Sequence, residues 1–144
     1  MKVVVQRVSK ASVSVDNQVV GSIKEGLMLL VGFTQDDTLK NIDYMVNKVL
    51  NLRIFPDEHG VMNKSVIDIG GSILSISQFT LYGDASKGNR PSYVKALKGE
   101  EAIKLYEIFN EKLKENVLVE TGVFGADMQV ELVNMGPTTI ILEK

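Results

Sequence analysis

The stretch Ser77-Gln78-Phe79-Thr80-Leu81 closes an apolar run, Ile73-Leu74-Ser75-Ile76, around which the rest of the chain is organised. The composition of this stretch predicts a buried strand. It is flanked by Gly70-Gly71 before the run and by Gly83-Asp84 after the motif. That strand delivers a serine, a glutamine and a threonine to its end. Each of the three needs a partner, because an unpaired buried polar group costs about 1–3 kcal/mol. The partner is either the backbone of an ordinary capped turn or a ligand.

Apolar and alternating stretches elsewhere predict about eight strands in all. β-Branched residues recur near the start of the chain, and Asp16-Asn17 supplies the turn of a hairpin. Near the end of the chain, Asn134-Met135-Gly136-Pro137 is expected to separate the last two strands. Nine segments have strand character, for a total of about eight strands, and they are residues 2–7, 11–15, 18–23, 27–33, 53–55, 73–81, 117–120, 128–133 and 138–142.

Apolar residues spaced three and four apart predict helices over residues 39–50 and 100–114, the first of them capped by Asp36-Asp37. No fixed-period repeat, low-complexity tract or linker interrupts the chain. We therefore expect an α/β fold in a single compact domain over residues 1–144. Its mixed, largely antiparallel β-sheets are flanked by the two main helices. A chain of this length buries roughly 68–70% of its unfolded surface, which is enough for a core.

Composition excludes several kinds of chemistry. The chain has no cysteine and one histidine, His59, which lies in a predicted turn between Pro56 and Gly60. Disulfides, thiolate nucleophiles, zinc–thiolate centres and a Ser-His-Asp triad are therefore not expected. No calcium-binding loop, dinucleotide fingerprint or phosphate-binding loop is present. We expect no metal and no cofactor.

The longest apolar run, Leu27 to Val31, is too short to span a bilayer, so the sequence predicts a cytoplasmic protein without a membrane partner. The net charge of −2 lacks the basic signature of a nonspecific nucleic-acid binder. Any RNA contact must come from a local patch, for which Lys87 and Arg90 are the candidates. A solvated basic surface is the simpler interpretation of these lysines and arginines.

An enzyme of this composition has no conventional acid–base side chains and must rely on positioning and on backbone dipoles. That strategy suits an intrinsically labile bond, whose transition state needs an oriented reactant and a stabilised oxyanion rather than a strong base.

Two motifs, Ser77-Gln78-Phe79-Thr80-Leu81 and Asn134-Met135-Gly136-Pro137-Thr138-Thr139, resemble the signature pair of the D-aminoacyl-tRNA deacylase family. The closing motif of that family usually reads Asn-Asp-Gly-Pro-Val-Thr, so Met135 and Thr138 depart from it. The resemblance covers the whole chain through four further blocks, which are residues 5–8, 48–55, 87–92 and 121–126.

The resemblance implies the deacylase fold and a homodimeric, cytoplasmic hydrolase with active sites at the subunit interface. Its substrates would be D-aminoacyl-tRNA and glycyl-tRNA, and L-aminoacyl-tRNA would be rejected as a form of translational proofreading. The ester is already activated, and the 2′-hydroxyl of the terminal ribose can act as an internal catalytic group. In the family, Thr80 is the side-chain candidate for nucleophile, with the RNA hydroxyl as the alternative.

The resemblance also assigns site residues. Ser77, Gln78, Phe79 and Thr80 would form the catalytic pocket, with the Phe79 and Thr80 amides as oxyanion donors. Gly136 and Pro137, joined by a cis peptide bond, would enter the partner subunit's pocket as the chirality filter. Arg7 and Asn134 would support that segment. Lys87 and Arg90 are expected to contact the tRNA backbone because their loop directly follows the motif strand. The adenine pocket would consist of Phe124, Gly125, Ala126 and Met128.

Two other functions remain open at this stage. A noncatalytic RNA-binding module would use the basic loop after the central motif. A general esterase without stereochemical preference would use the same pocket. For Phe124 and Met128 the alternative role is core packing, and for Arg7 it is an exposed position on an edge strand.

Overall fold

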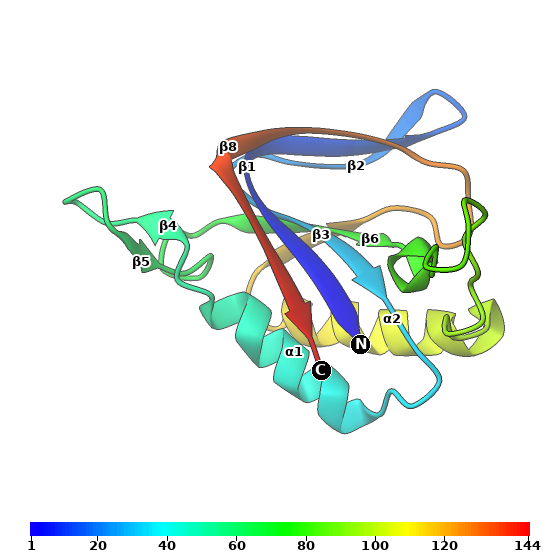
Figure 1. Ribbon diagram of the computed structural model, residues 1–144. Helices are drawn as coiled ribbons and strands as arrows, with labels where there is room; N and C mark the ends of the chain where they lie inside the picture. The colour runs from blue at the N-terminus through cyan, green and yellow to red at the C-terminus, as the bar shows by residue number, and fades with distance from the viewer.

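Two long strands from opposite ends of the chain lie side by side through the fold. In the computed structural model, which describes residues 1–144, β1 (Lys2–Val15) pairs antiparallel with β8 (Gln129–Glu143). The first half of β1 also pairs with β3 (Gly26–Gly32), and its second half pairs with β2 (Gln18–Ile23). Figure 1 shows both long strands turning sharply at the same place, so that the sheet curls over.

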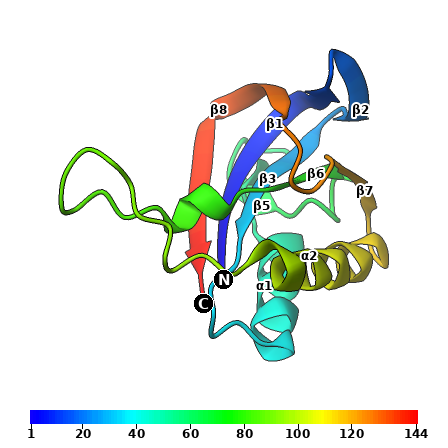
Figure 2. The same cartoon turned by 90° about the vertical axis from the view of Figure 1, so that its right-hand side faces the viewer.

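The sheet continues beyond β3 with two parallel strands. β6 (Ser72–Ser77) pairs with β3, and β7 (Leu118–Thr121) pairs with β6. Parallel neighbours require a crossover connection, and here the crossovers carry α1 (Leu39–Asn51) and α2 (Gly99–Lys114). Both helices lie on the same side of the sheet (Figures 1 and 2).

A small hairpin and one 3-10 helix complete the structure. β4 (Phe55–Pro56) pairs with β5 (Met62–Lys64) in a separate two-stranded sheet, and η1 (Phe79–Tyr82) follows β6. One six-stranded mixed sheet, one two-stranded antiparallel sheet and two α-helices confirm the predicted fold class. Neither α-helix combines the length and the apolar character that crossing a membrane would require.

Apolar residues are buried on both faces of the central strands. The larger core lies between the sheet and the two helices and includes Leu27, Leu29 and Ile73. A smaller core lies within the curl of the sheet and includes Met28 and Leu74. Neighbouring residues of one strand therefore enter different cores, which explains the nearly continuous apolar runs of β3 and β6.

The last two predicted strands are one strand, so the expected separation at Asn134 to Pro137 is wrong. Gln6 of β1 pairs with Thr139 and Val8 pairs with Asn134, which leaves residues 135–138 of β8 facing Arg7 alone. The extra residues form a large bulge, and antiparallel pairing resumes on each side of it. Sequence periodicity shows the interruption but does not distinguish a bulge from a turn.

The motif strand is shorter than predicted. β6 ends at Ser77, and the amide of Gln78 makes a hydrogen bond of 2.7 Å to the carbonyl of Val31 on β3. The backbone then turns, and Leu81 N–H donates to the Gln78 carbonyl at 3.3 Å within η1. Thr80 therefore lies on a 3-10 turn instead of on a strand. The short strand predicted over residues 53–55 likewise lies later, at Phe55–Pro56.

The first helix begins differently from the prediction. Its N-cap is Thr38, whose amide donates to Asn41 Oδ1 at 3.0 Å, so Asp36 and Asp37 do not cap it. Leu39, expected on the buried stripe, is 55% exposed because it lies in the first turn, at the helix surface. Asp37 has a different role at the chain terminus.

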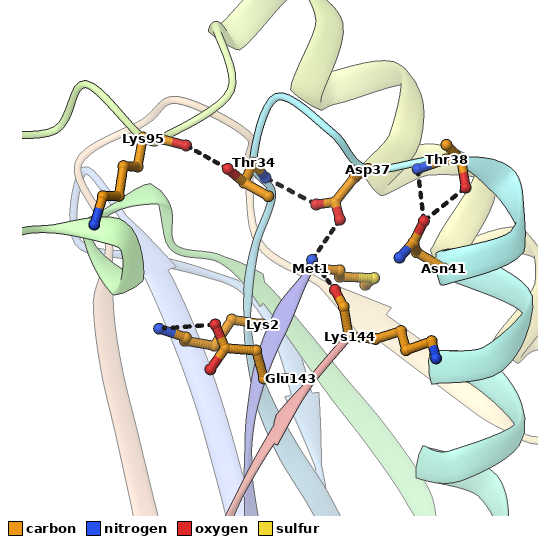
Figure 3. A network of polar contacts seen from close by, with 9 residues as sticks. All are labelled: Met1, Lys2, Thr34, Asp37, Thr38, Asn41, Lys95, Glu143 and Lys144. Carbon is orange, nitrogen blue, oxygen red and sulfur yellow. Dashed lines mark hydrogen bonds and ion pairs between the residues drawn. The ribbon is translucent and has the colours of Figure 1, made fainter.

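The amino-terminal ammonium group is buried and bound by Asp37 (Figure 3). The Met1 ammonium also donates to the Lys144 carbonyl at 2.7 Å, and Asp37 Oδ2 accepts a hydrogen bond from the Thr34 amide at 2.8 Å. The Asp37 side chain is only 2% exposed. The Met1 ammonium group and the Asp37 carboxylate together therefore link the start of β1, the residue after β8 and the loop before α1.

Replacing Asp37 with asparagine should lower the free energy of unfolding by about 3 kcal/mol, because removal of one partner leaves a buried ammonium group uncompensated. Urea denaturation at neutral pH measures this change. Asp36→Asn is the matched control, since Asp36 is exposed, and it should alter stability by less than about 0.5 kcal/mol. Equal stability of the two variants would contradict the assigned ion pair.

Candidate functional site

A pocket of about 620 Å³ lies at the end of β6, between η1 and the loop that precedes β8. It brings together residues that are far apart in the sequence. Ser77, Gln78 and Phe79 line one part of it, and a second segment lines the opposite part. The lining residues from that second segment are Phe124, Gly125, Ala126, Asp127 and Met128.

The turn from β6 into η1 leaves two backbone donors free of helical partners. The first hydrogen bond of η1 is made by Leu81 N–H, so the amides of Phe79 and Thr80 come before it. The first N–H groups of any helix have no acceptor within the helix. Phe79 lines the pocket, so its amide lies where an anion or a carbonyl oxygen can be bound.

Thr80 is not among the residues that line the pocket. Its hydroxyl accepts a hydrogen bond of 2.5 Å from Gln78 Nε2, and the residue is exposed. Two of the three polar side chains of the motif are therefore bonded to each other. Each of the three was expected to bond either to the backbone of a turn or to a ligand.

The second wall of the pocket depends on close packing around Gly122. A Cβ atom there would lie 2.4 Å from Met128 Sδ, so only glycine lets Met128 reach its position. The Phe124 ring lies 5.7 Å from the Tyr106 ring, and the Tyr106 hydroxyl donates to the Ser75 carbonyl at 2.7 Å. Burial raises the pKa of Tyr106.

Several lining residues were not singled out from the sequence. Gly32 approaches the motif so closely that a Cβ would lie 2.9 Å from the Gln78 carbonyl. A glycine at the end of a buried strand is the one signal that could have indicated this contact. The others lie in or just after β3, in β6, in the loop before α2, in α2 and in β8, and are Val31, Phe33, Ile76, Tyr93, Ala96, Leu97, Gly99, Ala102 and Val130.

Gly136 and Pro137 lie on the exposed bulge of β8, and the peptide bond between them is cis. Arg7 fills the bulge, because its Nε and Nη2 donate to the Met135 carbonyl at 3.0 and 2.9 Å. Asn134 accepts a hydrogen bond of 2.6 Å from the Thr138 amide. Arg7 and Asn134 thus both form hydrogen bonds within this segment.

The bulge does not line the pocket of its own chain. Ser77 of β6 pairs with Val31 of β3, Val31 pairs with Val3 of β1, and Val3 pairs with Leu142 of β8. β8 is therefore the third strand from β6 along this path. Pro137 lies five residues further along β8, so it is roughly 20 Å from Ser77 by standard strand spacings. Within a single chain, the structure keeps the two signature motifs apart.

Lys87 and Arg90 lie in an exposed loop that projects beyond η1 (Figure 2). An antiparallel bridge between Asp84 and Ser92 closes the base of this loop. Neither basic residue lines the pocket.

Comparison with known proteins places these features in context. A family model described as D-Tyr-tRNA(Tyr) deacylase matches residues 4–143 of the chain. A solved structure described as c-Myc DNA Unwinding Element Binding Protein is 44% identical, with coverage of 100% of this chain and 99% of that chain and a TM-score of 0.95. A structure described as a probable eukaryotic D-amino acid tRNA deacylase is 18% identical, with coverage of 98% and 97% and a TM-score of 0.84. That second likeness shows the fold alone.

Removing the Tyr106 hydroxyl should lower the free energy of unfolding by about 1–2 kcal/mol, because the buried Ser75 carbonyl loses its donor. Urea denaturation of Tyr106→Phe at pH 8 measures the loss. Tyr44→Phe is the control, since Tyr44 is 40% exposed, and it should leave stability unchanged.

The pKa of Tyr106 is raised in the folded state, whereas an unfolded tyrosine titrates near pH 10. Above about pH 10 the unfolded state therefore loses its proton first, and the stability of the wild-type protein falls as pH rises. Tyr106→Phe should show a shallower fall between about pH 10 and 11. An identical pH dependence in both proteins would contradict the assigned burial of this hydroxyl.

Proposed function

The chain belongs to the D-Tyr-tRNA(Tyr) deacylase family, and we propose that it hydrolyses the ester between a D-amino acid and the 3′-terminal adenosine of tRNA. The observation that carries this proposal is the pocket in which Phe79, whose amide has no helical partner, lies with an apolar wall. Glycine mischarged on tRNA is a second expected substrate, and the cytoplasm is the expected compartment.

The ester carbonyl oxygen would rest on the amides of Phe79 and Thr80. A water molecule adds to the carbonyl carbon, and the negative charge that develops on the oxygen is stabilised by these two dipoles. The bond to the ribose 3′-oxygen then breaks. The water supplies the hydroxyl of the released acid, and its remaining proton goes to the 3′-oxygen through the neighbouring 2′-hydroxyl.

Adenine would occupy the other wall of the pocket. Phe124 and Met128 offer an apolar surface for a base, and base–aromatic stacking contributes about 1–3 kcal/mol. Gly125, at a φ of +76°, and Ala126 keep that wall free of larger side chains. Tyr106 supports Phe124 from behind, through the contact between their rings.

Gly136 and Pro137 would act in a homodimer, in the pocket of the partner subunit. Their carbonyls would accept hydrogen bonds from the ammonium group of the substrate. With that group and the ester carbonyl both held, an L side chain would collide with the backbone of the segment, while a D side chain would point outward. Glycine would be admitted because it has no side chain to collide.

A second candidate function is nucleic-acid binding without catalysis. The exposed loop that carries Lys87 and Arg90 favours it, and the 44% identical structure is named for binding a DNA element. In the deacylase, the same loop would contact the tRNA backbone. The two functions differ in whether an ester is cleaved.

Incubation with D-tyrosyl-tRNA and L-tyrosyl-tRNA separates these possibilities. We expect loss of the D ester only, measured as release of labelled tyrosine. A binding module would leave both esters intact, and a general esterase would cleave both.

We expect Thr80→Ala to retain substantial single-turnover activity, because the proposed mechanism uses the backbone of Thr80 and not its hydroxyl. A tRNA ending in 2′-deoxyadenosine should be cleaved far more slowly by the wild-type enzyme. If Thr80→Ala lost activity by a factor approaching the roughly 10⁶-fold effect of removing a true nucleophile, the Thr80 hydroxyl would be the nucleophile.

Subunit mixing tests whether the β8 bulge acts in the partner. A Cβ at Gly136 would lie 2.6 Å from Thr138 Oγ1, so Gly136→Ala should distort the segment. Ala126→Trp should fill the adenine pocket. Each variant alone should be inactive, but mixed dimers would contain one intact site, which restores about a quarter of wild-type activity in an equal mixture. No recovery after verified subunit exchange would place both motifs in the same chain's site.

A further inference from the structure

Two aromatic rings stand partly exposed at the mouth of the pocket. Phe79 is 57% exposed and Tyr93 is 41% exposed, and both line the pocket. The rings meet edge to face, with their centroids 5.1 Å apart and an interplanar angle of 70°. We call this pair the aromatic shelf. Exposed rings grouped beside a pocket are a common feature of binding surfaces.

The backbone around the aromatic shelf fixes its position. At Gly83 a Cβ would lie 3.0 Å from the Tyr93 ring, so glycine makes room for that ring beside η1. In the two residues that follow Tyr93, the Lys95 carbonyl accepts a hydrogen bond from Thr34 Oγ1 at 2.7 Å, and the Val94 carbonyl accepts one from Gln35 Nε2 at 3.2 Å. The backbone that carries Tyr93 is therefore tied to the segment after β3.

The proposed function places the aminoacyl group next to this shelf. Phe79 supplies one of the amides that would bind the ester carbonyl oxygen. Covalent bonds span about 1.5 Å, so the side chain of that aminoacyl group begins only a few bond lengths from the Phe79 ring. A nucleotide is a less suitable occupant, because the next nucleotide is attached through the 5′-oxygen of the adenosine, away from the ester.

We propose that the aromatic shelf contacts the outward-pointing side chain of the D-aminoacyl group and favours aromatic and large apolar side chains over small ones. This inference rests on the proposed deacylase function. Different D-aminoacyl groups would then be cleaved with a graded preference that follows the size of the side chain. Tyr93 is the specificity-determining residue, because its ring adds apolar surface without supplying an amide to the reaction.

The test compares kcat/KM for D-tyrosyl-tRNA with kcat/KM for D-alanyl-tRNA. We expect the wild-type protein to favour D-tyrosyl-tRNA and Tyr93→Ala to reduce the ratio about 2- to 10-fold, because it loses one aromatic contact. Tyr93→Phe keeps the ring and should keep the ratio. Val94→Ala is the matched neighbour, since Val94 is 78% exposed, and it should also keep the ratio.

Several results would overturn the proposal. An unchanged ratio in Tyr93→Ala would rule out the contact with the substrate side chain. If Tyr93→Ala lowered kcat/KM for D-tyrosyl-tRNA but not for D-tyrosyl-adenosine, the ring would instead contact a nucleotide of the tRNA. Dissociation of Tyr93→Ala dimers in sedimentation experiments would assign the shelf to a second copy of the chain. A wild-type protein that cleaves neither substrate would instead contradict the proposed function itself.

Discussion

The pairing of β1 with β8 is the constraint on which the other parts of the structure depend. β1 joins β3, β2 and β8 into one sheet, and the bulge opposite Arg7 is where both long strands turn. A guanidinium group suits this place because its rigid fork binds the Met135 carbonyl through two nitrogens and the Ile54 carbonyl through the third, at 2.5 Å. The same interaction therefore bends the sheet and presents Gly136 and Pro137 at its surface.

Much of the fold can be predicted from the periodicity of apolar residues and from local turn chemistry. The features that could not be predicted depend on contacts between distant segments of the chain. The turn at Asp16-Asn17 and the bounds of β2 were predicted correctly, because short-range turn chemistry determines them. The continuity of β8 through Pro137 was not predicted, since only pairing with β1 distinguishes a bulge from a turn. Asp37 was assigned to a helix cap because the sequence does not show that the amino terminus lies beside it.

The candidate site was predicted to a similar extent. Ser77, Gln78 and Phe79 of the motif share one pocket with the segment from Phe124 to Met128, whereas Thr80 lies outside its lining, and the roles of these residues are proposals. The contributions of Tyr93 and Gly32 were missed, because they follow from loop conformation and from backbone approach. What the site offers chemically is mainly backbone: a 3-10 turn whose first amides are free, beside a wall of apolar side chains.

The two apolar cores share their central strands, and this has a consequence for unfolding. Leu27 and Leu29 of β3 enter the larger core while Met28 enters the smaller one, and Ile73 and Leu74 of β6 are divided in the same way. Neither core can be lost while these strands stay paired in place. The slowest amide hydrogen exchange should therefore be found in β3 and β6, and both cores should be lost in a single cooperative transition.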